Sequence, residues 1–366
     1  MASASTKVAT TKSILAPSMT LKGHEHWIES ISYFPDGQRM ISGSRDKTTR
    51  QWDLKEGKEI EEVRDVCKEG VYAVAVSRDS RWVVTGGGDD NRAELKACEV
   101  EMGIVKNLEG HSRRIQCIDI SEDNTLLASG SWDETVRIWN LETGKLVAGP
   151  FKSIDWVGAV RFSTDSKKLA VKSWTGKCLE VWDVQSQKLD KRIGNRSDNI
   201  GSISFAPIFW TNKNKNILVA FSFTKDVNDA KTIYEFDAST LETVGTPFEG
   251  HTKLVRGLGL SLDGALLASA SHDNTIKLWA FKSRQILASF DVQNPWLLIL
   301  SSDSRKLVYT TYTVVPPSNS GLAYTTSTKD HRICICDTPP DVLAKAHTIA
   351  PQKLVRALTN PLDVCV

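Results

Sequence analysis

The stretch GHEHWIESISYFPDGQRMISGSRDKTTRQWD (Gly23–Asp53) recurs twice, as GHSRRIQCIDISEDNTLLASGSWDETVRIWN (Gly110–Asn140) and GHTKLVRGLGLSLDGALLASASHDNTIKLWA (Gly250–Ala280). In each copy a Gly-His pair is followed 22 residues after the His by an Asp, and six residues later by a Trp; a Ser stands four residues before the Asp. Self-similarity at a fixed period is the signature of a repeat architecture. The chain is therefore expected to consist of repeated structural units.

The four shared residue types can form a hydrogen-bonded relay inside each unit. The Asp accepts from a neutral His ring, the His contacts the Ser hydroxyl, and that hydroxyl accepts the indole N–H of the Trp, so every buried polar atom has a partner. A catalytic Ser-His-Asp triad is needed once, at a cleft, whereas this set recurs three times with a Trp attached. We therefore expect no catalytic residue and assign a structural relay to three quartets: His24, Ser42, Asp46 and Trp52; His111, Ser129, Asp133 and Trp139; His251, Ser269, Asp273 and Trp279.

The Trp position of the repeat can be followed through seven units. It is occupied in order by Trp52, Cys98, Trp139, Trp182, Phe236, Trp279 and Cys336. Within a unit, runs of β-branched and apolar residues are broken by turn residues, as in Ile115–Ile120, Thr125–Ser131 and Thr135–Asn140. Four short strands per unit, repeated seven times, predict an all-β fold: a seven-bladed β-propeller of four-stranded antiparallel blades.

The chain resembles the WD-repeat, or beta-transducin-like, family of β-propellers. The three stretches quoted above carry the resemblance, which extends over residues 18–338. In that family a strand ahead of the first repeat completes the last blade, so the resemblance implies that Ser18–Lys22 closes the ring and removes an open sheet edge. We expect a flexible N-terminal arm over residues 1–17, the propeller over 18–338, and a tail over 339–366 that is either a short helix packed on the propeller or an arm that orders on binding.

Units 2, 4, 5 and 7 depart from the pattern. Unit 4, for example, has Lys172 and Gly176 where the relay needs Ser and Asp. Since the relay cannot form in these units, we expect their blades to depend on apolar packing and to be looser. Units 5 and 7 also contain insertions, Trp210–Asn216 and Val314–Ser320, which are candidate recognition loops.

Composition excludes several classes of partner. Charged residues make up 25% of the 366 residues and the formal net charge is +2, which gives no electrostatic reason to bind nucleic acid. No apolar run reaches the roughly 18 residues of a membrane-spanning helix. We therefore expect neither a nucleic-acid nor a membrane partner.

The cysteines favour a reducing compartment. Their number, seven, is odd, and most lie in apolar runs, which is typical of reduced thiols in the cytoplasm, with the nucleus as the alternative. Neither the C-x-C of Cys334 and Cys336 nor the H-x-H of His24 and His26 supplies the four ligands of a structural zinc. Phosphate-binding and hydrolase motifs are missing as well, so we expect no metal and no cofactor.

The resemblance also implies a binding surface. In similar proteins, partners bind the narrower face of the disc through three positions per repeat: three and five residues after the His, and the residue before the turn Asp. Trp, Tyr and Arg dominate binding hot spots. The alternative is that the indoles pack onto neighbouring blades, since large aromatic residues are usually mostly buried. Carried over residue by residue, the candidate partner-binding residues are Trp27, Glu29, Arg45, Tyr72, Arg114, Gln116, Trp132, Trp156, Thr175, Arg256, His272, Trp296 and Lys329.

The leading functional interpretation is a non-enzymatic scaffold that binds a peptide or protein partner, itself a monomer within a larger complex. One alternative is a substrate receptor of a cullin-type ubiquitin ligase. Such receptors commonly carry W-D-x-R, and Lys55 and Gln185 occupy the place of that Arg in Trp52–Lys55 and Trp182–Gln185. The other alternative, an enzyme using the propeller channel, lacks clustered carboxylates or histidines beyond the relay.

Overall fold

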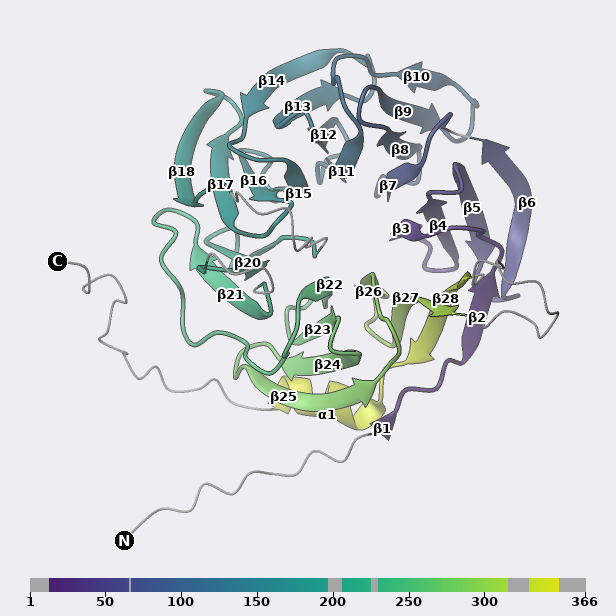
Figure 1. The fold of residues 1–366 in the computed structure, drawn as a ribbon, viewed down its shortest axis with the longest axis vertical. Coiled ribbons are helices and arrows are strands. Elements are labelled where there is room, and N and C mark those ends of the chain that lie inside the picture. The colour runs from purple at the N-terminus through teal and green to yellow at the C-terminus, as the bar shows by residue number, and fades with distance from the viewer. Residues whose placement is uncertain (1–12, 66, 197–205, 225–229, 315–328, 349–366) are drawn as a thin grey trace, which may run out of the picture.

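Seven antiparallel sheets stand around a central axis (Figure 1). The structure is a computed structural model that describes residues 13–65, 67–196, 206–224, 230–314 and 329–348. Each sheet corresponds to one unit of the sequence and is numbered accordingly as a blade. The predicted all-β, seven-bladed propeller is confirmed.

The strands of the first four blades follow the chain from the channel outward. Blade 1 holds β3 (Ile28–Tyr33), β4 (Arg39–Ser44), β5 (Thr48–Asp53) and β6 (Lys58–Asp65). Blade 2 holds β7 (Val71–Val76), β8 (Trp82–Gly88), β9 (Ala93–Glu99) and β10 (Val105–Asn107). Blade 3 holds β11 (Ile115–Ile120), β12 (Leu126–Ser131), β13 (Thr135–Asn140) and β14 (Leu146–Lys152). Blade 4 holds β15 (Val157–Phe162), β16 (Lys168–Ser173), β17 (Cys178–Asp183) and β18 (Lys188–Gly194).

Blade 6 has four consecutive strands, whereas blades 5 and 7 depart from that pattern. Blade 5 has three strands, β19 (Phe209–Thr211), β20 (Asn216–Phe221) and β21 (Thr232–Asp237), and isolated bridges Ile233↔Phe248 and Phe236↔Thr243 beyond them. Blade 6 holds β22 (Val255–Leu260), β23 (Leu266–Ser271), β24 (Thr275–Ala280) and β25 (Gln285–Asp291). Blade 7 holds β26 (Leu298–Leu300), β27 (Lys306–Val314), β28 (Lys329–Asp337) and, from the other end of the chain, β2 (Met19–Lys22).

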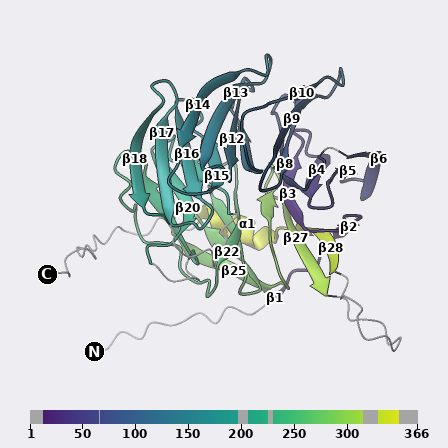
Figure 2. The same ribbon diagram turned by 45° about the horizontal axis from the view of Figure 1, so that its top comes forward.

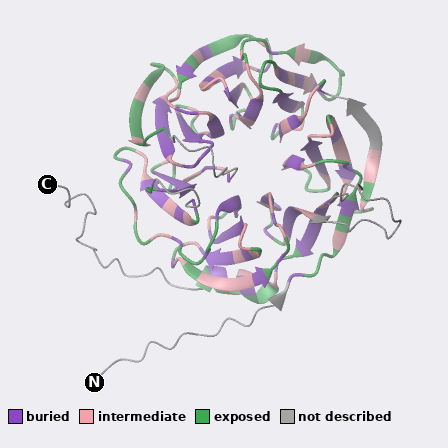
Figure 3. Ribbon diagram, in the orientation of Figure 1, coloured by how far each residue is buried: buried purple, intermediate pink, exposed green. Residues whose placement is uncertain are grey.

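The interior of the ring is a series of apolar layers between neighbouring blades. Between blades 2 and 3, for instance, Trp82 and Val84 form one buried cluster with Ile115, Leu127 and Trp139. Buried residues dominate the inner strands and exposed residues the outer ones (Figure 3). Because every blade is covered on both faces, its inner strands can consist of nearly continuous apolar residues.

The predicted ring closure is confirmed. Strand β2 pairs antiparallel with β28, with Met19 opposite Ile335 and Lys22 opposite Arg332. Leu21 of β2 is buried against Ile333 and Val308 of blade 7. Blade 7 is therefore built from two segments that lie far apart in the chain.

The segments flanking the propeller pack on blade 6. Within the segment expected to be a flexible arm, β1 (Ser13–Ile14) pairs in parallel with β25, and Leu15 is buried. Beyond the propeller, α1 (Pro340–Thr348) places Val342 and Ala346 in the same apolar cluster (Figure 1). No helix in the described part of the chain is long and apolar enough to cross a membrane.

The insertion of unit 5 is a hairpin rather than the loop that we expected. Its residues Trp210 and Thr211 belong to β19 and Asn216 begins β20, with Trp210 paired to Ile217. The turn between them, 212–215, starts with three residues of positive φ. In the insertion of unit 7, Val314 ends β27, and residues 315–320 lie outside the described residues.

Candidate functional site

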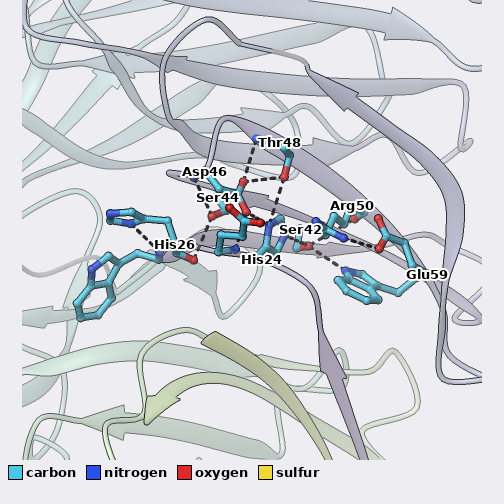
Figure 4. Close-up of polar contacts among 11 residues, drawn as sticks. His24, His26, Ser42, Ser44, Asp46, Thr48, Arg50 and Glu59 are labelled. Atoms are coloured by element: carbon cyan, nitrogen blue, oxygen red, sulfur yellow. Dashed lines mark hydrogen bonds and ion pairs between the residues drawn. The ribbon is translucent and has the colours of Figure 1, made fainter. Parts of the chain in front are cut away.

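In blade 1 the four relay residues lie in contact (Figure 4). The ring of His24 bonds Asp46 Oδ2 through Nδ1 at 2.7 Å and Ser42 Oγ through Nε2 at 2.7 Å. The indole Nε1 of Trp52 donates to the same hydroxyl at 2.9 Å. Blades 3 and 6 repeat all three bonds at 2.8 to 2.9 Å. The relay connects the segment that precedes β3 with β4 and β5 and the turn between them, which is a structural task.

Electrostatics explains why the relay is stable when buried. Burial opposes ionisation of Asp133, but hydrogen bonds from His111 and Thr135 outweigh it and lower the pKa of the carboxyl to about 2. In blade 6, burial lowers the pKa of His251 despite its bond to Asp273. In blade 6 the pair is therefore the neutral imidazole of His251 with the carboxylate of Asp273. Its Nδ1–H donates to Asp273, and its Nε2 accepts from Ser269.

The relay position of blade 4 is not at Lys172, where the sequence analysis placed it. The turn between β16 and β17 has four residues, 174–177, against three in blade 1, so counting back from Trp182 misplaces the relay position by one. Leu169 pairs with Trp182 as Met40 pairs with Trp52. Val171 therefore occupies the position that Ser42 has in blade 1, and Lys172 is one residue beyond it.

A different polar network replaces the relay in blade 4. The indole of Trp182 donates to Glu180 Oε2 at 3.1 Å, and Arg192 donates to Glu180 Oε1 at 2.8 Å. Lys172 is fully buried and donates through Nζ to the Ala206 carbonyl at 2.5 Å. Burial lowers the pKa of Lys172 to about 7. Blade 4 thus adds these polar contacts to the apolar packing that we expected it to depend on.

A β-bulge lies at the mouth of the central channel in five of the seven blades. In five blades the inner strand has a register shift near its first residue, and a bulge of this kind redirects one side chain. The cavity behind this mouth measures about 440 Å³. The five bulged residues all line it: Glu29, Tyr72, Gln116, Gly158 and Arg256.

Arginines gather around Glu29 at this mouth. Arg45 Nε donates to Glu29 Oε1 at 2.5 Å. The guanidinium of Arg114 lies over the rings of Trp132 and Tyr72, at 3.1 and 4.9 Å, and that of Arg256 over Trp296 at 3.8 Å. Burial raises the pKa of Glu29 although three arginines oppose the rise, and burial lowers the pKa of Arg256 to about 10.

Two aromatic clusters flank the arginines. In blades 3 and 4, Trp132 stacks on Trp156 at 4.5 Å and contacts Trp174 at 4.4 Å. Across blades 6, 7 and 1, Trp27 contacts Trp296 at 4.9 Å and Tyr312 at 4.4 Å. We call the whole surface the rim belt: Trp27, Glu29, Arg45, Tyr72, Arg114, Gln116, Trp132, Trp156, Trp174, Arg256, His272, Trp296, Tyr312 and His331.

The structure brings most of the candidate binding residues into the rim belt, but packs them tightly. Glu29, Gln116, Trp132 and Arg256 are buried. The others are half-buried: Trp27, Arg45, Tyr72, Arg114, Trp156, His272 and Trp296. The indoles thus pack on neighbours, as the alternative interpretation held, and leave edges at the surface.

Two candidates were misplaced, and three residues were missed. The longer turn of blade 4 puts Trp174, not Thr175, at the position of Arg45, because Trp174 N–H donates to Trp156 as Arg45 N–H does to Trp27. Lys329 begins β28 and pairs with Val314 at one end of the nine-residue pairing of β27 with β28, and its side chain lies outside the described part. Figure 2 shows the two strands side by side. The same extension adds Tyr312 and His331 to the belt.

The C-x-C pair lies in the interior of blade 7. Cys334 and Cys336 are buried, and burial raises the pKa of Cys336 to about 12, so the thiols stay protonated. Across the described residues, no group of three or more His, Cys, Asp or Glu is arranged to hold a metal ion.

Comparisons with known proteins identify the repeat. The family model "WD domain, G-beta repeat" matches residues 15–53, 62–94, 102–140 and 241–280, which belong to blades 1, 2, 3 and 6. The WD repeat-containing protein SL1-17 of Schistosoma mansoni is 28% identical over 228 residues, 60% of this chain and 69% of that protein. The small ribosomal subunit protein RACK1 of Drosophila melanogaster is 28% identical over 266 residues, 72% and 80% of the two chains.

The chain is similar to a third relative over a shorter stretch. The guanine nucleotide-binding protein subunit beta of Oryza sativa subsp. indica is 33% identical over 128 residues, 33% of this chain and 34% of that protein. The repeats that the family model matches are blades of the same closed ring as the three that it does not match. The chain is a seven-bladed β-propeller that carries repeats of the WD family in blades 1, 2, 3 and 6.

Proposed function

We propose that this chain is a non-enzymatic scaffold that binds a peptide or protein partner through the rim belt. The observation that carries the proposal is the gathering of tryptophan, tyrosine and arginine around one mouth of the channel. These residue types supply most of the binding energy in protein interfaces, and do so best at the centre of a patch. The belt has that arrangement, since its arginines lie at the mouth and its aromatic clusters lie on either side.

The packing of the belt also favours binding. Side chains that already contact one another lose little conformational entropy when a partner covers them. Trp132, Trp156 and Trp174 hold each other in place, and Arg114 is stacked on Trp132. The belt is therefore a preorganised surface.

Two relatives support a role within complexes, through their printed names alone. One is a subunit of a guanine nucleotide-binding protein and another is a protein of the small ribosomal subunit. For this chain we propose the corresponding kind of role, as a single propeller within a larger cytoplasmic assembly. The partner remains to be identified by experiment.

The test is affinity capture from cell extract with the full chain. The rim variant combines Arg114→Ala, Trp132→Ala and Arg256→Ala; a matched control combines Arg39→Ala, Lys167→Ala and Arg305→Ala, three exposed or half-exposed residues of the opposite turns. Circular dichroism and thermal unfolding establish that each variant is folded. We expect the control to retain the partners of the wild type and the rim variant to lose them; an unchanged partner set for a folded rim variant would contradict the proposal.

A further inference from the structure

The channel mouth contains more positive than negative charge. Three guanidinium groups, those of Arg45, Arg114 and Arg256, act electrostatically on the single buried carboxylate of Glu29. Asp90 lies 3.9 Å from Arg114, but it is 63% exposed and therefore largely solvated. Burying like charges together is costly unless an anion completes the set.

The bulged positions do not account for this excess. They hold one acid, one base, two neutral polar residues and one glycine, so their charges balance. The excess comes from Arg45 and Arg114, which lie outside the strands that bulge. Gly158 cannot be replaced by a larger residue without shifting the backbone, because an added Cβ would lie 2.6 Å from Trp174 Cα. Blade 4 therefore contributes no charge at this level.

Two of the arginines are oriented for a further ligand. Arg45 is held by Glu29 through Nε, and its side chain is still 38% exposed. Arg114 stacks on Trp132 with 15% of its side chain exposed, and its buried Nε has no hydrogen-bond partner among the described residues. Stacking occupies the face of a guanidinium and leaves donors in its plane, where an oxyanion binds.

We propose that the channel mouth binds an oxyanion of an acidic peptide, either a carboxylate or a phosphoryl group, through Arg45, Arg114 and Arg256. Glu29 is a positioning residue, because it fixes Arg45 without facing solvent. The inference rests on the proposed function and specifies the chemistry of the partner. A peptide rich in lysine and arginine is disfavoured at the same place by repulsion.

The belt provides a direct signal for this binding. Arg114 lies on Trp132 and Arg256 on Trp296, so recruiting either guanidinium to an anion changes tryptophan emission. Three synthetic peptides of one length serve as probes: one with consecutive glutamates, one with a phosphoserine replacing the central glutamate, and one with glutamines throughout. Fluorescence titration is paired with calorimetry on the full chain.

We expect the acidic peptides to bind with an affinity that falls as salt is raised, and the glutamine peptide not to bind. The tighter of the two acidic peptides identifies the source of the oxyanion. Arg45→Gln and Arg256→Gln should each weaken binding about tenfold or more, since each removes a charge-assisted hydrogen bond. Arg39→Gln, at the opposite end of the strand that leads to Arg45, should leave affinity unchanged.

Equal binding of all three peptides, no binding of the acidic peptides, or wild-type affinity in Arg45→Gln would overturn the inference. Arg45 is half-exposed, so its variant folds even where Arg256→Gln does not. If the rim variant loses its partners in the capture experiment while the acidic peptides fail to bind, the oxyanion inference is wrong and the scaffold proposal stands.

Discussion

Replacing Lys172 by Met should stabilise the protein and remove part of its pH dependence. The amine is fully buried, and burial lowers its pKa from 10.5 to about 7. At 1.36 kcal/mol per pKa unit, that gap corresponds to about 5 kcal/mol. A methionine has a similar length and no charge to desolvate, although it leaves the Ala206 carbonyl without the bond from Nζ.

The direction in which stability changes with pH follows from the number of protons bound in the folded and unfolded chains. Between pH 7 and 10.5 the unfolded chain holds a proton on this lysine and the folded chain does not, so the stability of the wild type rises with pH. Over the accessible interval from pH 7 to 9, Lys172 contributes a rise of about 2 kcal/mol. Lys172→Met lacks that contribution and is expected to exceed the wild type by about 2 kcal/mol at pH 7, once about 1–3 kcal/mol is deducted for the lost hydrogen bond.

The assay is urea unfolding at pH 7, 8 and 9. Other groups that titrate in this range are shared by both proteins and cancel in the difference between their unfolding free energies. Lys167→Met, an exposed change next to the same strand, is the control and should run parallel to the wild type. If the unfolding free energies of Lys172→Met and the wild type changed with pH in the same way, the reasoning would be refuted. That result would mean that Lys172 is charged inside the fold.

Three further results are expected. Ser129→Ala leaves the ring of His111 and the indole of Trp139 without their shared partner, so it should cost about 2–4 kcal/mol in urea unfolding, and a loss under 0.5 kcal/mol would count against the relay. Asp133 has its pKa lowered to about 2, so its contribution to stability is present above about pH 4 and is lost as the pH falls toward 2; Asp133→Asn should flatten the acid side of a stability profile, and an unchanged profile would argue otherwise. Leu21→Ala should cost about 3 kcal/mol by opening a cavity beneath β2, measured as a lower unfolding midpoint, and a neutral result would show that β2 does not close the ring.

The sequence determined the fold because the relay fixes strand register. Ser42 and Trp52 lie on β4 and β5, and Asp46 lies in the turn between them. Only one register of these strands lets all three meet His24, which precedes β3. Repeating that constraint three times set the unit length, and the remaining four blades could be counted from it. The number of blades and the closing strand followed without any information on packing.

Residues at turns were harder to place, since turn length is not tied to the apolar pattern. One extra residue before Cys178 moved Trp174 into the belt, and the long β27–β28 pairing placed Lys329 at the start of a strand. Aligning unit 4 from the start of its second strand, rather than back from Trp182, would have found Trp174. The buried partners of Lys172 come from the next blade, and no spacing within one repeat reveals them.

The pairing of β2 with β28 makes the ring depend on two segments that lie far apart in the chain. Ser18 and Ile335 are bonded across 317 residues, so β2 cannot take its place in blade 7 until β28 has been synthesised. Until then β28 has an open edge. Glu29 comes from blade 1 and Arg256 from blade 6, on either side of blade 7, so the channel mouth that they share is assembled only when the ring closes. A translation product interrupted before β28 contains the belt residues of blades 1 to 6 and still lacks the closed ring.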